Sequence, residues 1–131
     1  MPLSRWLDLK VTQRCNNHAR KCTYCAVPTS PPTAPELMAM ETIHRTLLDA
    51  RALGFDTFWL LGGEPTCRDD AEHLVDPLAS DPRVALTVVT NGKTPRWPLY
   101  DALFATAARR AMVQGVLVGR SLGFISGCLG F

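Results

Sequence analysis

Three segments of the chain have the hydrophobic pattern of β-strands. Residues 6–12 alternate apolar and polar side chains, which is the period of a strand with one buried face. Residues 55–61 form an apolar run rich in aromatic residues, and residues 84–90 form a run rich in β-branched residues that ends at Asn91-Gly92. We therefore expect three strands, each followed by a turn or loop.

Two helices are predicted between these strands. Residues 33–36 (Thr-Ala-Pro-Glu) have the spacing of a capping box, and Gly54 supplies a C-terminal stop. Apolar residues recur at helical period between these points, at Leu37, Met40, Ile43, Leu47 and Ala50. Residues 69–78 indicate a second, short helix with acids in its first turn. The alternating order predicts an α/β fold, a parallel sheet in β-α-β-α-β order with both faces covered.

Composition and charge narrow the function. The 131 residues are 47% hydrophobic and 20% charged, which suits one globular domain. A net charge of +2 is too small to indicate a nucleic-acid partner. Residues 1–10 lack the apolar core of an export signal, so the five cysteines are expected as thiols in a reducing cytoplasm.

Three of these cysteines lie close together in the long polar loop of residues 13–35, at Cys15, Cys22 and Cys25. Their clustering points to a metal. Zinc would need a fourth ligand, which His18 or Cys67 could supply. Cys67 and Cys128 lie outside the cluster and are expected to be ordinary thiols. The cysteine loop follows the first predicted strand, a Gly-Gly turn the second and Thr-Asn-Gly the third, and parallel sheets build sites at that edge.

In these motifs the chain resembles the radical S-adenosylmethionine (radical SAM) enzymes. Their signature is three cysteines with an aromatic residue before the last one, a place that Tyr24 holds here. Their second signature ends the second strand and is matched by Gly62, Gly63, Glu64 and Pro65. The first cysteine gap is six residues rather than the usual three. The longer loop costs only about 0.5 kcal/mol more in closure entropy, so it does not forbid a cluster.

The resemblance implies a mechanism and a set of site residues. Cys15, Cys22 and Cys25 would ligate a 4Fe–4S cluster, beside which Arg20 and Lys21 would lie. Its open iron would bind S-adenosylmethionine, with the amino group positioned by Glu64 and the backbone of residues 62–63. An electron from a reductase or flavodoxin-type donor would cleave the cofactor to a 5′-deoxyadenosyl radical, which takes hydrogen from a substrate that the sequence does not identify.

Three of the implied roles have a structural alternative. Backbone near Tyr24 would contact adenine, but Tyr24 is equally well explained as a packing aromatic. Asn91 would line the same cavity, or serve only as a turn residue before Gly92. Glu64 could be a solvated acid of the turn.

The end of the chain fits the resemblance poorly. The family core is a six-stranded, TIM-like partial barrel, and residues 1–110 correspond to its N-terminal half. Residues 98–113 predict one more helix and residues 115–118 a weak strand. We expect residues 111–131 to be an atypical Gly-rich tail of a truncated or frame-shifted chain, so the alternative function is a non-catalytic iron–sulfur or zinc-binding remnant. Arg120 in this tail argues against a membrane span, since a charge there costs about 2.5–3.5 kcal/mol.

Overall fold

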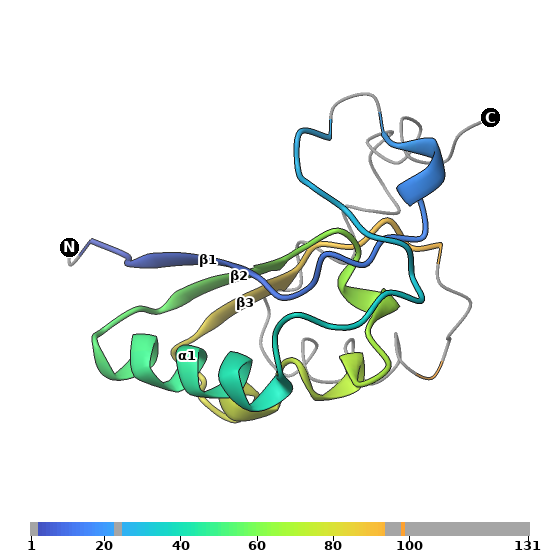
Figure 1. The fold of residues 1–131 in the computed structure, drawn as a ribbon. Coiled ribbons are helices and arrows are strands. Elements are labelled where there is room, and N and C mark those ends of the chain that lie inside the picture. Colours follow the sequence, from blue (N-terminus) through green and yellow to red (C-terminus); the bar gives the residue numbers. More distant parts are fainter. Residues whose placement is uncertain (1–2, 23–24, 94–97, 99–131) are drawn as a thin grey trace.

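A computed structural model describes residues 3–22, 25–93 and 98 of the chain. Its regular elements are three strands and one α-helix: β1 (Trp6–Lys10), α1 (Met40–Ala52), β2 (Thr57–Leu61) and β3 (Ala85–Val88). Short 3₁₀ turns occur at His18–Arg20, Pro65–Cys67, Ala71–His73 and Asp76–Leu78. The three strands lie side by side, and the loop after β1 rises from their carboxyl ends (Figure 1).

The strands form one parallel sheet in the order β1-β2-β3. Trp6 pairs with Thr57, and Thr57 pairs in turn with Ala85, so the strands start level with one another. This confirms the predicted α/β class and the parallel sheet, and three open strands are consistent with part of a radical SAM barrel.

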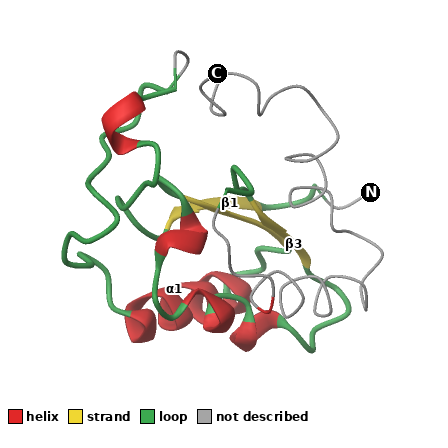
Figure 2. Cartoon of the chain, turned by 90° about the vertical axis from the view of Figure 1, so that its right-hand side faces the viewer, coloured by secondary structure: helices red, strands yellow, loops and turns green. Residues whose placement is uncertain are grey.

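The core lies between the sheet and α1. Phe58 and Leu60 of β2 are fully buried, as are Ile43 and Leu47 of α1. Figure 2 shows α1 and the turns after β2 on one side of the sheet, while the loop after β1 runs from the other side past the strands down to α1. Within the described residues, helices therefore cover one face of the sheet, whereas the sequence predicted cover on both. An arrangement with helices outside and loops above is that of a barrel wall.

Helix α1 begins several residues later than predicted. Its N-cap is Ala39, which makes no side-chain capping hydrogen bond. Glu36, the predicted partner in the capping box, instead accepts hydrogen bonds from Thr12 and Arg68. Because the Glu36 carboxylate is engaged by these distant residues, it does not cap the start of the helix. The C-terminal stop at Gly54 is present, with φ of +90°.

The second predicted helix is also different. Residues 69–78 contain two separate 3₁₀ turns, at Ala71–His73 and Asp76–Leu78, instead of one α-helix. Pro77 lies in the second turn, where it removes a backbone donor that a continuous helix would use. The turns still bury Ala71, Leu74 and Leu78 against the core.

Several predicted features lie outside the described residues: the helix at residues 98–113 beyond its first residue, the strand at 115–118, Cys128 and the tail of residues 111–131. Within the part of the chain that the structure describes, no helix is long and apolar enough to cross a membrane.

Candidate cofactor site

The segments that follow the three strands meet at one edge of the sheet. The Gly-Gly turn after β2 donates two backbone hydrogen bonds to the loop after β1, from Gly63 N to Thr12 O (3.0 Å) and from Glu64 N to Arg14 O (2.7 Å). Both acceptors lie just before Cys15. The sequence-predicted motifs are thus held together by direct backbone contacts.

Glycine is required in this turn by the backbone next to it. A Cβ atom on Gly62 would lie 2.7 Å from the carbonyl oxygen of Thr12. A Cβ atom on Gly63 would lie 2.8 Å from the oxygen of Gln13 and closer still to the oxygen of Arg14. Real Cβ atoms do not approach backbone so closely, and the two glycines therefore set the spacing between the turn and the cysteine loop.

Glu64 is fully buried and joins the ends of β2 and β3. Its Oε1 accepts hydrogen bonds from the hydroxyls of Thr66 and Thr90, both at 2.6 Å, and from the backbone N–H of Thr66. Its Oε2 accepts from the backbone N–H of Asn91 at 2.6 Å. Burial raises the pKa of Glu64, and these hydrogen bonds oppose that shift. With a side chain 1% exposed, Glu64 is not a solvated acid of the turn.

Two of the three motif cysteines share one neighbour. Cys15 and Cys22 are buried, and Asn17 between them donates its backbone N–H to Cys15 Sγ (3.4 Å) and its side-chain Nδ2 to Cys22 Sγ (3.5 Å). Cys25 is less buried and follows in a turn closed by a hydrogen bond from its N–H to the carbonyl oxygen of Cys22. The loop therefore brings the sulfurs of Cys15 and Cys22 to the same asparagine. Cys15 and Cys25 are free, whereas Cys22 is disulfide-bonded in this structure, so the expectation of thiols is wrong for Cys22.

The loop is tied to the end of β3 by two further polar contacts. Asn91 Nδ2 donates to Asn16 Oδ1 at 2.7 Å, and Lys93 Nζ donates to Asn17 Oδ1 at 2.9 Å. Asn91 thus lies beside the cysteine loop and also caps its own turn, accepting the backbone N–H of Lys93 at 3.0 Å. Pattern reasoning singled out Asn91 but missed the other three residues, whose only signal was position within or next to a motif.

The pKa of the Cys15 thiol depends on its burial and on the polar groups around it. Burial raises the pKa of the Cys15 thiol, and so do the charges of Glu64 and Cys25, whereas the N–H of Asn17 and the charge of Lys93 lower it. Among these contributions to the pKa of Cys15, the positive charge is that of Lys93. Arg20 and Lys21, which the sequence placed beside the cysteines, have exposed side chains.

The remaining predicted residues have separate places. Pro65 is buried at the start of a 3₁₀ turn, with Cys67 at the end of it. His18 Nδ1 lies 3.0 Å from the hydroxyl of Thr29. Tyr24 lies outside the described residues. Among those that are described, no three His, Cys, Asp or Glu side chains are grouped closely enough to hold a metal ion.

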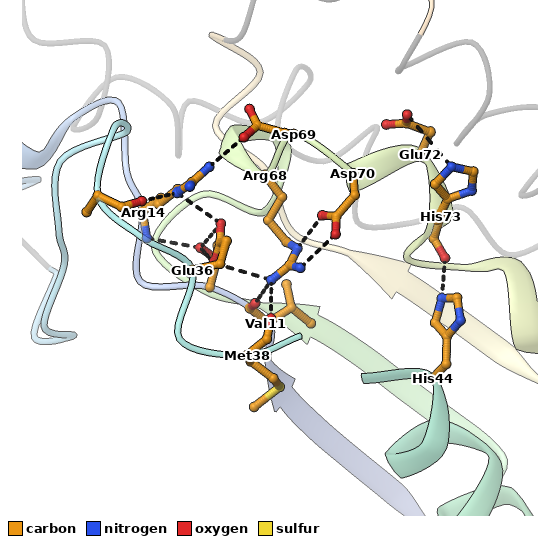
Figure 3. A network of polar contacts seen from close by, with 12 residues as sticks. Val11, Arg14, Glu36, Met38, His44, Arg68, Asp69, Asp70, Glu72 and His73 are labelled. Carbon is orange, nitrogen blue, oxygen red and sulfur yellow. Dashed lines mark hydrogen bonds and ion pairs between the residues drawn. The ribbon is translucent and has the colours of Figure 1, made fainter. Parts of the chain in front are cut away.

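A second polar cluster lies next to the site and is centred on Arg68, which is 1% exposed. Figure 3 shows its contacts. Its guanidinium pairs with both oxygens of Asp70, at 2.8 and 3.0 Å. It also donates to the carbonyl oxygens of Val11 and Met38, each at 2.9 Å, and to Glu36. Arg68 thus connects the end of β1, the approach to α1 and the turn after β2.

Arg14 extends this cluster to the cysteine loop. Its Nε lies 3.2 Å from Glu36 Oε1, and its Nη1 lies 3.2 Å from Asp69. Because the backbone of Arg14 also accepts the N–H of Glu64, the cluster and the Gly-Gly turn contact the same residue. Local sequence patterns gave no sign of this cluster, since its members come from three separate segments, residues 11–14, 36–38 and 68–70.

Comparison with known proteins gives three kinds of result. The sequence model of the radical SAM superfamily matches residues 9–113. A GTP 3',8-cyclase from Synechococcus elongatus is 36% identical over 104 residues, which is 76% of this chain and 29% of the relative. The Molybdenum cofactor biosynthesis protein moc-5 of Caenorhabditis elegans is 31% identical over 90 residues, 66% of this chain and 14% of the relative.

Another GTP 3',8-cyclase, from Mannheimia succiniciproducens, is 38% identical over 93 residues, or 66% of this chain and 26% of the relative. The chain therefore spans less than a third of the length of these relatives. No solved structure matches it.

Proposed function

Because the chain belongs to the radical SAM superfamily, whose members use a 4Fe–4S cluster and S-adenosylmethionine, we propose that the carboxyl edge of its sheet binds these two cofactors. The observation that carries this proposal is the direct joining of the cysteine loop, the Gly-Gly turn and the end of β3. These are the same two cofactors that the sequence motifs led us to expect.

The residue types at this edge are those that hold iron–sulfur clusters, but the three sulfurs are not grouped around one metal position in this structure, and Cys22 would first have to be reduced from its disulfide. Soft thiolate sulfur is the usual ligand of such clusters, and Cys15 and Cys22 are buried next to hydrogen-bond donors. Donors of this kind stabilise the electron-rich sulfur of a bound cluster. Cys25 follows within one turn of Cys22 and supplies the third thiol.

The proposal gives each site residue a role. Cys15, Cys22 and Cys25 hold the cluster. The backbone of Gly62 and Gly63 positions the amino group of S-adenosylmethionine, while Glu64 and Pro65 fix the turn that presents it. Backbone near Tyr24 contacts the adenine, and Asn91 lines the same cavity next to Asn16. When bound, the two cofactors supply one-electron chemistry that ends in hydrogen abstraction from a substrate.

The relatives and the family supply candidates for the substrate and the electron donor. The relatives named GTP 3',8-cyclase make guanosine triphosphate the first substrate to test. Enzymes of this family need a reductant, and we propose a flavodoxin or a reductase in that role. Thiolate ligands require a reducing compartment, for which the cytoplasm is the natural candidate.

Anaerobic reconstitution of the 131-residue chain with iron and sulfide tests the proposal. We expect the iron and sulfide content of one 4Fe–4S cluster per chain, and an electron paramagnetic resonance signal of the reduced cluster that changes when S-adenosylmethionine is added. Reduction should then release 5′-deoxyadenosine.

Cysteine variants give the matched control. Cys15→Ala, Cys22→Ala and Cys25→Ala should each lose the cluster, whereas Cys67→Ala should retain it. Stoichiometric zinc without iron, or iron that is retained in all three motif variants, would instead favour a non-catalytic metal-binding remnant.

A further inference from the structure

The disulfide of Cys22 keeps one motif cysteine from acting as a metal ligand. Cys22 is bonded through its sulfur, whereas Cys15, Cys25 and Cys67 are thiols. The bond therefore leads outside the described residues, where Cys128 is the remaining cysteine of the sequence. Metals bind the thiolate form of cysteine, which a disulfide sulfur cannot supply. In this state the loop offers two of its three sulfurs as ligands.

The sulfur of Cys22 is poorly accessible from solvent. Cys22 is 9% exposed, and the side chain of Asn17 covers it, with Nδ2 3.5 Å from Cys22 Sγ. Thiol–disulfide exchange requires the attacking sulfur to reach the bond, so its rate depends on access. We therefore expect a reductant in solution to attack this bond slowly unless another thiol of the chain takes part.

Cys25 is the thiol closest in sequence to this bond, and it is less buried than Cys22. Its backbone N–H donates to the carbonyl oxygen of Cys22 at 3.0 Å, which closes a turn of four residues. The first and last Cα atoms of such a turn lie within about 7 Å, and disulfides join Cα atoms about 4.4–6.8 Å apart. The spacing therefore allows a direct bond between Cys22 and Cys25.

The thiol of Cys25 is weakly held where it is. Its Sγ lies 3.8 Å from the carbonyl oxygen of Val27, to which it donates, and a thiol is a weak donor. Little hydrogen-bond energy is therefore lost when this sulfur turns to attack.

From this arrangement we propose that Cys22 and Cys25 form a thiol–disulfide switch. The disulfide of Cys22 withholds one ligand from a metal, and Cys25 is the resolving thiol that releases it. Disulfides in reducing compartments are mostly transient and serve catalysis or redox sensing, which suits this role. The switch goes beyond the proposed function, since it controls when the loop can bind any metal that takes thiolate ligands.

The release has two steps. The thiolate of Cys25 attacks Cys22 Sγ, so that a bond between these two sulfurs forms, the present bond of Cys22 breaks, and the departing sulfur takes up a proton. This step is redox neutral. A dithiol of the thioredoxin or dithiothreitol class then reduces the new bond, giving up two electrons and two protons and becoming a disulfide itself, while Cys22 and Cys25 end as thiols.

Timed reduction of the folded full chain tests the switch without any metal. The chain is prepared without reductant and treated with dithiothreitol for increasing times. Each sample is then denatured, alkylated and analysed by peptide mass spectrometry. Cys22 should be unmodified at time zero and alkylated after reduction. In Cys25→Ser its release should be about tenfold slower, because the attack from within the chain is lost.

Cys67→Ser is the matched control, since it removes another partly exposed thiol that lies outside the turn. Its rate should equal that of the unchanged chain. A variant that unfolded would expose the Cys22 bond and be reduced faster, so unfolding cannot produce the expected slowing. Alkylation of Cys22 at time zero, an unchanged or faster release in Cys25→Ser, or equal slowing in Cys67→Ser would overturn the proposal.

The switch and the proposed function fail separately. A chain that releases Cys22 as expected but takes up no iron after reduction contradicts the proposed function and leaves the switch standing. A chain that loads its cluster equally well with and without prior treatment by the dithiol contradicts the switch alone.

Discussion

Gly63 lies where two backbone segments come too close for a side chain. The carbonyl oxygens of Gln13 and Arg14 occupy the space that its Cβ would need. From the family resemblance we expected Gly62 and Gly63 to let a ligand approach the backbone closely. The structure adds that the pair is already needed for contact with the cysteine loop.

We expect Gly63→Ala to destabilise the fold by about 1–3 kcal/mol, because the added methyl group pushes the turn away from that loop. Urea denaturation measures the change. Gly92→Asn is the control, since Gly92 has open space around it and Asn tolerates its φ of +69°. Equal stability of Gly63→Ala and the unchanged chain would contradict the packing described for this turn.

The carboxylate of Asp70 allows a prediction about pH. The bidentate pair with Arg68 lowers the pKa of Asp70 from its usual 3.8. A lowered pKa in the folded state contributes stability above the unfolded pKa and loses it as pH falls through the folded value. Asp70→Asn should thus be less stable at pH 7 by about 1 kcal/mol, a modest figure because the carboxylate is 39% exposed.

Denaturation midpoints of Asp70→Asn and the unchanged chain, measured from pH 7 downwards, check this. The gap between them should narrow below about pH 4. A gap that stays constant across this range would show that the charge of Asp70 does not stabilise the fold.

At the scale of elements, Arg68 is the connection between parts that have no regular hydrogen bonding in common. Removing it takes the guanidinium donor away from the carbonyl oxygens of Val11 and Met38. It also takes from Asp70 its bidentate partner and from Glu36 one of its two ion pairs. We expect Arg68→Met to cost about 3–5 kcal/mol of unfolding free energy.

Arg68→Lys keeps the charge but cannot make the two-pronged pair with Asp70, so it should recover only part of that loss. Thermal and urea denaturation of both variants measure it. Full recovery with lysine would mean that charge alone, without the shape of the guanidinium, holds these segments together.

Prediction from sequence worked where neighbours in the chain decide the outcome. The strands follow from hydrophobic period, and the end of α1 follows from Gly54, because both depend on local residues. The predicted start of α1 was wrong because Glu36 pairs with Arg68, which lies more than 30 residues away in sequence. Asn17 and Lys93 could not be identified for the same reason, since their contact joins residues that are distant in sequence.

At the scale of the whole molecule, the sheet has two open edges among the described residues, β1 on one side and β3 on the other. Unpaired strand edges invite association with other chains. The side of the sheet away from α1 also carries Trp6, which is 58% exposed and packs against Trp59 with the two rings tilted by 36°.

We predict that the isolated chain self-associates as its concentration rises. Charges placed on β3 and directly after it, as in Ala85→Lys with Val89→Lys, should reduce that association, which sedimentation velocity measures. Leu48→Lys adds a charge on the exposed side of α1, away from both edges, and should change little. Equal suppression by Leu48→Lys would trace the association to net charge rather than to the strand edges.

The register of β1 has a consequence for how the protein is made. Trp6 has its partner at Thr57, about 50 residues later, so the first strand leaves the ribosome long before its neighbour exists. At about 5–20 residues per second, that interval lasts several seconds. Throughout it, Cys15 and Cys22 are on an unpaired nascent chain, open to oxidation and to stray metals. Insertion of the proposed cluster would therefore have to follow the synthesis of β2, with the cysteines protected until then.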